Sequence, residues 1–223
     1  MYRGFRVFVA VAAAAAAGGS LVIRADVPSS QAAEVQLQLG DLLSSEGRFL
    51  EALDAYRLAL KVAPPDDARR PRVGVIMAAL RVAEFDLARQ EAETLHRGSP
   101  NDSQSMTLYA DALWSMGLFQ EAEALYERAL AASPNLARGH HGMAKALAAR
   151  GRLGDAMNEA QAALRLAPRD LEIHHTVGTI YERQHKYEEA AAAYSNYVNL
   201  LPNKDHSASP YRVIDSGPVG SDL

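Results

Sequence analysis

The sequence predicts an all-α protein in which five helix hairpins stack into a solenoid, and three observations support this prediction. Prolines recur with spacings of 36, 34, 34 and 34 residues, an alanine stands twelve residues before each proline, and a large side chain precedes each alanine by three. These positions hold Phe49, Ala52 and Pro64; Phe85, Ala88 and Pro100; Phe119, Ala122 and Pro134; Leu153, Ala156 and Pro168; Tyr187, Ala190 and Pro202. A fixed period of this length is the signature of stacked structural repeats.

Each unit is predicted to contain two helices. Between residues 102 and 114, apolar residues recur with the i, i+3, i+4 and i+7 spacing of one helical face. A turn at Gly117 follows, and residues 121–130 repeat the pattern. Pro134 ends the second helix, because proline cannot continue a helix and disfavours helical geometry in the preceding residue. The small alanine that opens the second helix lets the two helices approach closely.

These residues make the chain similar to the tetratricopeptide repeat family, whose pattern W-x2-L-G-x2-Y…A-x3-F…P has a period of 34. The similarity covers residues 33–66, 69–102, 103–136, 137–170 and 171–204. It implies a right-handed superhelix whose first helices line a concave groove. The second repeat matches least well, because Asp67 and Ala68 are inserted before it and Pro71 lies in its first helix. A proline is tolerated there if it falls in the first helical turn.

The residues outside the repeats predict targeting and linking segments. Arg3 and Arg6 precede an uncharged stretch over residues 7–23, so residues 1–25 resemble a signal peptide or an N-terminal membrane anchor. Positive residues stay on the cytoplasmic side, which favours an exported, periplasmic or inner-membrane-anchored protein with its repeats outside the cytoplasm. An organellar transit peptide is the alternative. Residues 26–32 are predicted to be a linker and residues 205–223 a flexible C-terminal tail.

The composition excludes several functions. The formal net charge of −4 gives no drive toward nucleic acid, and the absence of cysteine excludes disulfides and thiolate chemistry. No catalytic, cofactor or phosphate-binding motif is present, so we expect neither an enzyme nor a bound cofactor. The pairs His140-His141 and His174-His175 lie 34 residues apart, and the family resemblance implies that at most His141 and His175 converge on the groove. Two ligands are too few for zinc, so we expect no metal site.

The family resemblance implies which residues bind a partner. In this family, defined positions of the first helix of each repeat line the groove. Carried onto this chain, these positions hold Thr107, Leu108, Asp111, Trp114, Arg138, His141, Lys145, His175 and Thr179. The mixed surface suits an extended or helical peptide that carries a hydrophobic anchor and an acidic group. The alternative is that these are ordinary solvated residues and the partner binds elsewhere.

The expected function is therefore a non-catalytic scaffold that binds a protein or peptide segment in its groove. A second hypothesis is an accessory or regulatory subunit of an envelope enzyme or of a secretion or assembly complex, in which the solenoid acts as a spacer. Membrane contact is expected only through the N-terminal segment. Self-association through the solenoid ends stays open.

Overall fold

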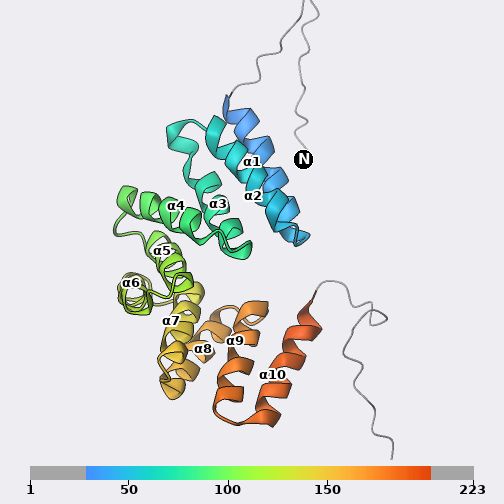
Figure 1. Ribbon diagram of the computed structural model, residues 1–223, viewed down its shortest axis with the longest axis vertical. Helices are drawn as coiled ribbons and strands as arrows, with labels where there is room; N and C mark the ends of the chain where they lie inside the picture. The colour runs from blue at the N-terminus through green and yellow to red at the C-terminus, as the bar shows by residue number, and fades with distance from the viewer. Residues whose placement is uncertain (1–28, 202–223) are drawn as a thin grey trace, which may run out of the picture.

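The computed structural model describes residues 29–201, which form ten α-helices, one short 3-10 helix and no strand (Figure 1). The helices are α1 Ser29–Ser45, α2 Phe49–Val62, α3 Arg69–Arg81, α4 Phe85–Gly98, α5 Ser103–Ser115, α6 Phe119–Ala132, α7 Ala137–Ala149, α8 Leu153–Leu166, α9 Leu171–Arg183 and α10 Tyr187–Leu200. Each helix contacts the next, and each first helix of a repeat also contacts the first helix of the following repeat. The predicted all-α solenoid of five hairpins is confirmed.

The two helices of each repeat are joined by the same turn. In all five turns, the fifteenth residue of the repeat has a positive φ, a conformation that favours glycine. Glycine stands there in three repeats, whereas Ala83 has φ 63° and His185 has φ 60°. Because the turn geometry is kept even where the residue is unfavourable, every hairpin folds back in the same way.

The inserted residues before the second repeat are absorbed outside its helices. A 3-10 helix, η1 Pro65–Asp67, fills the extra length, and α3 then starts at Arg69. Pro71 is the third residue of α3 and is buried, so it lies in the first turn, where its missing N–H leaves no helical hydrogen bond unmade. The weak match of this repeat to the family pattern therefore leaves both of its helices intact.

One predicted boundary is wrong. Helix α1 begins at Ser29, so residues 29–32 are helical and not part of a linker. Ala33 and Leu37 are both buried one turn apart and fix the helix against the core, and residues 29–32 continue it by one turn toward the N-terminus. The predicted segments over residues 1–25 and 205–223 lie outside the described residues. Within residues 29–201, no helix is both long and apolar enough to cross a membrane.

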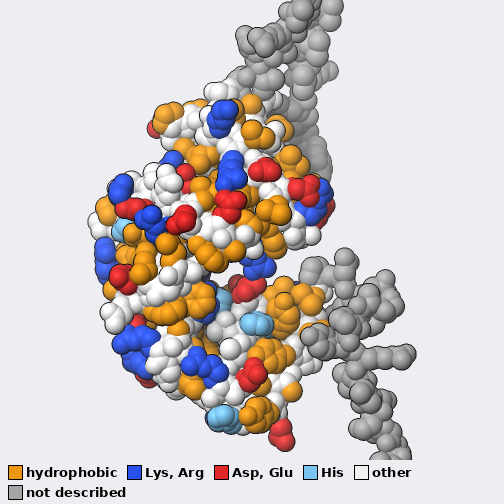
Figure 2. Space-filling model, viewed as in Figure 1, with side chains coloured by type: hydrophobic (Ala, Val, Ile, Leu, Met, Phe, Trp, Pro, Cys, Tyr) orange, Lys and Arg blue, Asp and Glu red, His pale blue; other side chains and the backbone are white. Residues whose placement is uncertain are grey.

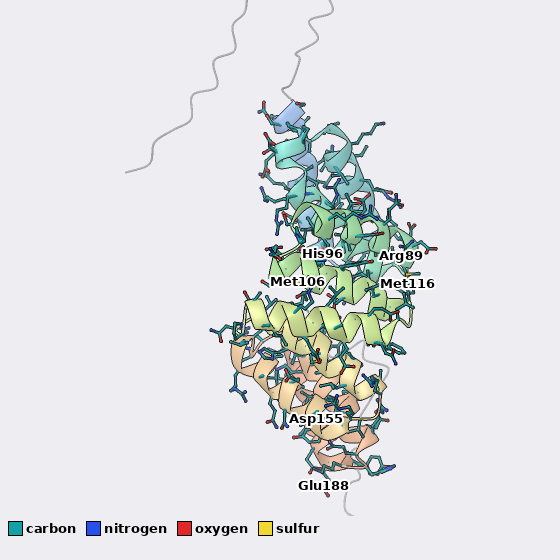
Figure 3. The ribbon with its side chains drawn as sticks, turned by 90° about the vertical axis from the view of Figure 1, so that its left-hand side faces the viewer. Arg89, His96, Met106, Met116, Asp155 and Glu188 are labelled. Atoms are coloured by element: carbon teal, nitrogen blue, oxygen red, sulfur yellow. The ribbon has the colours of Figure 1, made fainter. Side chains whose placement is uncertain are left out.

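The core is a continuous strip along the solenoid, formed by two clusters of buried side chains that meet at α5. Small residues let the helices approach. The five repeated alanines are all buried, and glycines face the rings of Tyr56, Tyr126 and Tyr194 so closely that a Cβ at these glycines would overlap them. Arg89 and His96 of α4 and Asp155 of α8 lie on the side turned away from the opening of the curve (Figure 3).

We predict that Gly142→Ala destabilises the fold by about 1–3 kcal/mol, because the added methyl would overlap the Tyr126 ring. Tyr126 is fully buried and its hydroxyl is hydrogen-bonded, so the ring cannot move aside. Urea unfolding followed by circular dichroism measures the effect. The matched control is Gly154→Ala, a helical glycine with open space around it, which should leave the stability unchanged or slightly higher. Equal stabilities of the two variants would contradict the proposed packing.

Candidate functional site

The concave side of the solenoid contains a cavity of about 660 Å³ that we call the central cavity. First helices of all five repeats contribute to its wall. Its lining residues are Ser44, Phe49, Met77, Leu80, Arg81, Phe85, Asp111, Trp114, Ser115, Arg138, His141, Lys145, Asp170, Glu172 and Ile173. Figure 2 shows the hollow between the repeats at the top and those at the bottom of the view. A surface built by every repeat can contact an extended segment along its length.

A buried carboxylate lies in the wall of the central cavity. The Oδ1 atom of Asp111 accepts a hydrogen bond of 2.6 Å from the hydroxyl of Tyr126. Its Oδ2 atom accepts one of 2.7 Å from Nε of Arg138, which comes from the next repeat. The side chain of Asp111 is 9% exposed and that of Arg138 is 37% exposed. The pair therefore joins α5 to α7 and cancels one positive charge of the cavity.

The protonation states of this cluster follow from its geometry. Burial opposes ionisation of Asp111, but the charges of Arg138 and Lys145 outweigh it and lower the pKa of the carboxyl below its ordinary value. Burial and the Asp111 carboxylate both raise the pKa of Tyr126 well above 10. The phenol thus keeps its proton and donates a hydrogen bond to Asp111 over the physiological range.

His141 is a neutral hydrogen-bonding group in the same wall. Its Nε2 atom lies 2.8 Å from the hydroxyl oxygen of Thr176 on α9. Burial, together with the charge of Lys145, lowers the pKa of His141 to about 4, and the carboxylates Asp111, Asp170 and Glu172 oppose this only in part. His141 therefore adds no charge to the cavity near neutral pH.

Lys145 is the cation of the central cavity that is available to a ligand. Its Nζ atom lies 4.2 Å from the centre of the Trp114 ring, a cation–π contact. No carboxylate among residues 29–201 forms an ion pair with it. Trp114 also packs edge-on against Phe119, with ring centres 6.0 Å apart. The arrangement presents one positive charge directly above a large apolar surface.

An ion pair spans the concave side. Nη1 of Arg81 on α3 lies 2.6 Å from Oε1 of Glu172 on α9, and the same guanidinium lies over the ring of Phe49 at 4.7 Å. Both charged side chains are about half exposed, 47% and 54%. An exposed pair of this kind contributes roughly 0–1 kcal/mol, so it joins the two halves of the solenoid only weakly.

The structure brings together five of the nine predicted site residues. Asp111, Trp114, Arg138, His141 and Lys145 all line the central cavity. The other four do not line it.

Thr107 and Leu108 were predicted to face the groove, and both are instead fully buried. Leu108 packs in the core with Ile76 and Ala79 of α3, and the hydroxyl of Thr107 donates to the carbonyl of Ser103. The reason for Leu108 is that the sixth residue of the repeat is a core position, which is also buried as Gly74, Gly142 and Thr176 in repeats 2, 4 and 5.

His175 and Thr179 lie beside the last helix and outside the central cavity. The His175 ring packs against Tyr194 and Tyr197, at centroid distances of 5.8 and 5.7 Å. The Thr179 hydroxyl lies 3.3 Å from that of Tyr194. No further repeat follows within the described residues, so these side chains end the solenoid and do not form part of the cavity wall.

Sequence reasoning missed the contribution of the first two repeats. Met77 is the ninth residue of repeat 2, as Lys145 is of repeat 4, and Leu80 is the twelfth, as Trp114 is of repeat 3. Arg81 follows Leu80 as the thirteenth residue, which is also a groove position in the family. Glu172 is the second residue of repeat 5, as Arg138 is of repeat 4. The signal was present, because applying the same repeat positions to all five units selects these residues.

No group of three or more metal-ligand side chains comes together within residues 29–201. His141 is hydrogen-bonded to Thr176, and His175 is enclosed by tyrosines. The two histidines that suggested a metal site therefore have other contacts.

Comparison with known proteins identifies the family. A tetratricopeptide repeat model matches residues 76–137 and 141–205, and a second tetratricopeptide repeat model matches residues 33–66. The chain belongs to the tetratricopeptide repeat family. A search of curated proteins found no match.

Two solved structures illustrate the shared fold. The chain resembles TTC0263, a thermophilic tetratricopeptide repeat protein of Thermus thermophilus, with a TM-score of 0.69 and 22% identity over 79% of this chain and 94% of that one. It also resembles MamA from Desulfovibrio magneticus RS-1, with a TM-score of 0.51 and 18% identity over 75% of this chain and 94% of that one. At these identities the likeness shows the fold alone.

We predict that Arg138→Met destabilises the protein by about 2 kcal/mol at neutral pH, because Asp111 loses its cation while it remains buried. Chemical unfolding of the single variants and of Asp111→Asn/Arg138→Met forms a double-mutant cycle. The double variant should recover part of the loss, since the neutral amide needs no counter-ion. A double variant less stable by the full sum of both single losses would contradict this coupling.

The low pKa of His141 predicts that protein stability falls in mild acid. In the unfolded chain the histidine has a pKa near 6.5 and becomes protonated below that pH. In the folded protein it stays neutral until the pH falls to about 4. The free energy of unfolding contributed by neutral His141 is therefore complete above pH 6.5 and is lost as the pH falls toward 4, by about 3 kcal/mol in total. Urea unfolding at several pH values should show this slope for the natural protein and a shallower one for His141→Gln. Identical slopes would refute the assignment.

Proposed function

We propose that this chain is a non-catalytic scaffold that binds a segment of a partner protein in the central cavity. The tetratricopeptide repeat fold supports a role in protein–protein interaction. The observation that carries the proposal is Lys145, a cation without an ion-pair partner among residues 29–201, placed 4.2 Å from the centre of the Trp114 ring within a cavity to which all five repeats contribute.

The chemistry of the cavity defines the segment. The side chains of Phe49, Met77, Leu80, Phe85 and Trp114 supply apolar area that an aliphatic or aromatic side chain would cover. Arg138 is already neutralised by Asp111, and Arg81 by Glu172, so Lys145 is the group that attracts a carboxylate. The segment thus carries an apolar anchor beside an acidic residue. Micromolar dissociation constants, about −8 kcal/mol, are expected for so small an interface.

We predict that Lys145→Glu weakens capture of acidic peptides at least tenfold, because an attractive charge becomes a repulsive one. A library of short random peptides is selected on the full-length protein, and the dissociation constants of the selected peptides are then measured by calorimetry. Trp114→Ala should also weaken binding, through loss of the apolar surface.

The matched control is Lys186→Glu, because Lys186 also lies over an aromatic ring, that of Tyr181, but outside the central cavity. It should leave binding unchanged. Failure to select any peptide, or equal effects of the two lysine variants, would refute the central cavity as the binding site.

A second candidate, the structural spacer, is supported by the outer face of α1. Val35, Leu39 and Leu42 follow one another at helical spacing and are 57%, 43% and 56% exposed. Such a stripe at a solenoid end suits an end-on contact with another subunit. Leu39→Glu/Leu42→Glu tests it, since loss of a partner in this variant together with retention in Lys145→Glu would favour the spacer role.

We further propose, as the sequence indicated, that the protein is exported or membrane-tethered through residues 1–25. The support is the pattern of Arg3 and Arg6 before an uncharged stretch.

A further inference from the structure

A second cavity, of about 490 Å³, adjoins the central cavity on the side of the first two repeats. We call it the N-terminal cavity. Its lining residues are Leu37, Asp41, Ser44, Ser45, Tyr56, Arg69, Arg70, Val73, Gly74, Met77 and Gln104. Ser44 and Met77 line both cavities, so a segment bound in the central cavity can continue into this one.

The N-terminal cavity contains a copy of the buried Tyr126–Asp111 pair. The hydroxyl of Tyr56 donates a hydrogen bond of 2.9 Å to Oδ1 of Asp41, as Tyr126 donates to Oδ1 of Asp111 at 2.6 Å. The two aspartates are the ninth residues of repeats 1 and 3, and the two tyrosines are the twenty-fourth. The rings are held alike, because Tyr56 faces Gly74 and Tyr126 faces Gly142, the sixth residues of the following repeats.

The two copies differ in the cation. Asp111 receives the guanidinium of Arg138, the second residue of the following repeat. The equivalent residue beside Asp41 is Arg70, and its Nη1 atom instead donates to Glu34 at 3.1 Å. Arg69, which lines the same cavity, is paired with Asp102 at 2.7 Å. Among the described residues, Asp41 therefore accepts a hydrogen bond from Tyr56 and has no ion-pair partner.

The Tyr–Asp pair thus occurs in a filled version, in which Arg138 pairs with Asp111, and in an open version, in which Asp41 has no ion-pair partner among the described residues. The filled version shows what the Tyr–Asp pair accepts, an arginine side chain that enters from the groove side and donates to the second carboxylate oxygen. In the open version Asp41 is exposed and lines the N-terminal cavity, and its Oδ2 atom accepts no hydrogen bond among the described residues. Both arginines nearby are neutralised by carboxylates outside the cavity lining, which leaves Asp41 as its unpaired charge.

We propose that Asp41, oriented by Tyr56, binds a basic side chain of the partner segment, an arginine or a lysine, in the N-terminal cavity. This inference rests on the proposed function, since it concerns the same bound segment. The segment then has a polar pattern, with a basic residue toward the first repeats and an apolar and an acidic residue toward Trp114 and Lys145. The two subsites together read opposite charges, which fixes the direction of the bound chain.

The test is peptide selection on the full-length protein, followed by a double-mutant cycle. Selected peptides should be enriched in a basic residue at a fixed distance from the apolar and acidic pair. Replacing that residue by glutamine should weaken binding to the natural protein about two- to fivefold, the effect of one accessible ion pair, and should not change binding to Asp41→Asn. The matched control is Asp86→Asn, which removes an exposed carboxylate of α4 that lines neither cavity. In this variant the glutamine replacement in the peptide should weaken binding as much as it does in the natural protein.

The outcomes separate the two proposals. If the natural protein selects no peptide, both fail. If it selects apolar, acidic peptides that depend on Lys145 but show no basic preference, the scaffold function stands and the role of Asp41 is refuted. The role is equally refuted if the glutamine replacement costs as much in Asp41→Asn as in the natural protein, because the basic residue then binds elsewhere.

Discussion

Close approach of helices at small residues is the constraint on which the rest of this structure depends. The five repeated alanines are buried, and four glycines leave no room for a methyl group beside a tyrosine ring. Interiors of this density tolerate neither voids nor added atoms, so the spacing between hairpins is fixed by these residues. Two of the tyrosines that fill the core end in a hydroxyl on the concave side, where they hold Asp41 and Asp111. Packing therefore determines where the charges of the groove lie.

The charges of the concave side are mostly neutralised within the protein. Arg138 lies on Asp111 and Arg81 on Glu172, which leaves the groove without a strong field of either sign. Affinity must then come from apolar contact, and selectivity from the few groups that remain unpaired. The Arg81–Glu172 pair joins repeats that do not follow one another, yet an exposed pair stabilises by little. Breaking this pair when a segment enters would therefore cost little free energy, while the continuous core keeps the repeats stacked.

The sequence predicts what each repeat determines by itself and misses what depends on contacts between repeats. The period recurs five times, so the hairpins and the buried alanines follow from it, and the family resemblance adds five residues of the central cavity. The start of α1 at Ser29 does not, because burial of Ala33 and Leu37 extends the helix beyond the repeat pattern. Leu108 was misplaced because the sixth residue of the repeat packs in the core in repeats 2 to 5, and Thr107 because it is buried with its hydroxyl hydrogen-bonded to a backbone carbonyl within α5.

A period of two repeats underlies the concave surface. The twenty-fourth residue is tyrosine in repeats 1, 3 and 5 and alanine in repeats 2 and 4. Because the tyrosine hydroxyl orients a carboxylate, Tyr–Asp subsites can form only at alternate repeats, and the intervening repeats contribute apolar residues, arginines, His141 and Lys145. In repeat 5 the hydroxyl of Tyr194 meets Thr179 and Glu182 instead of an aspartate. The groove is thus chemically directional although its backbone is nearly periodic, since each of the three tyrosines meets a different set of partners.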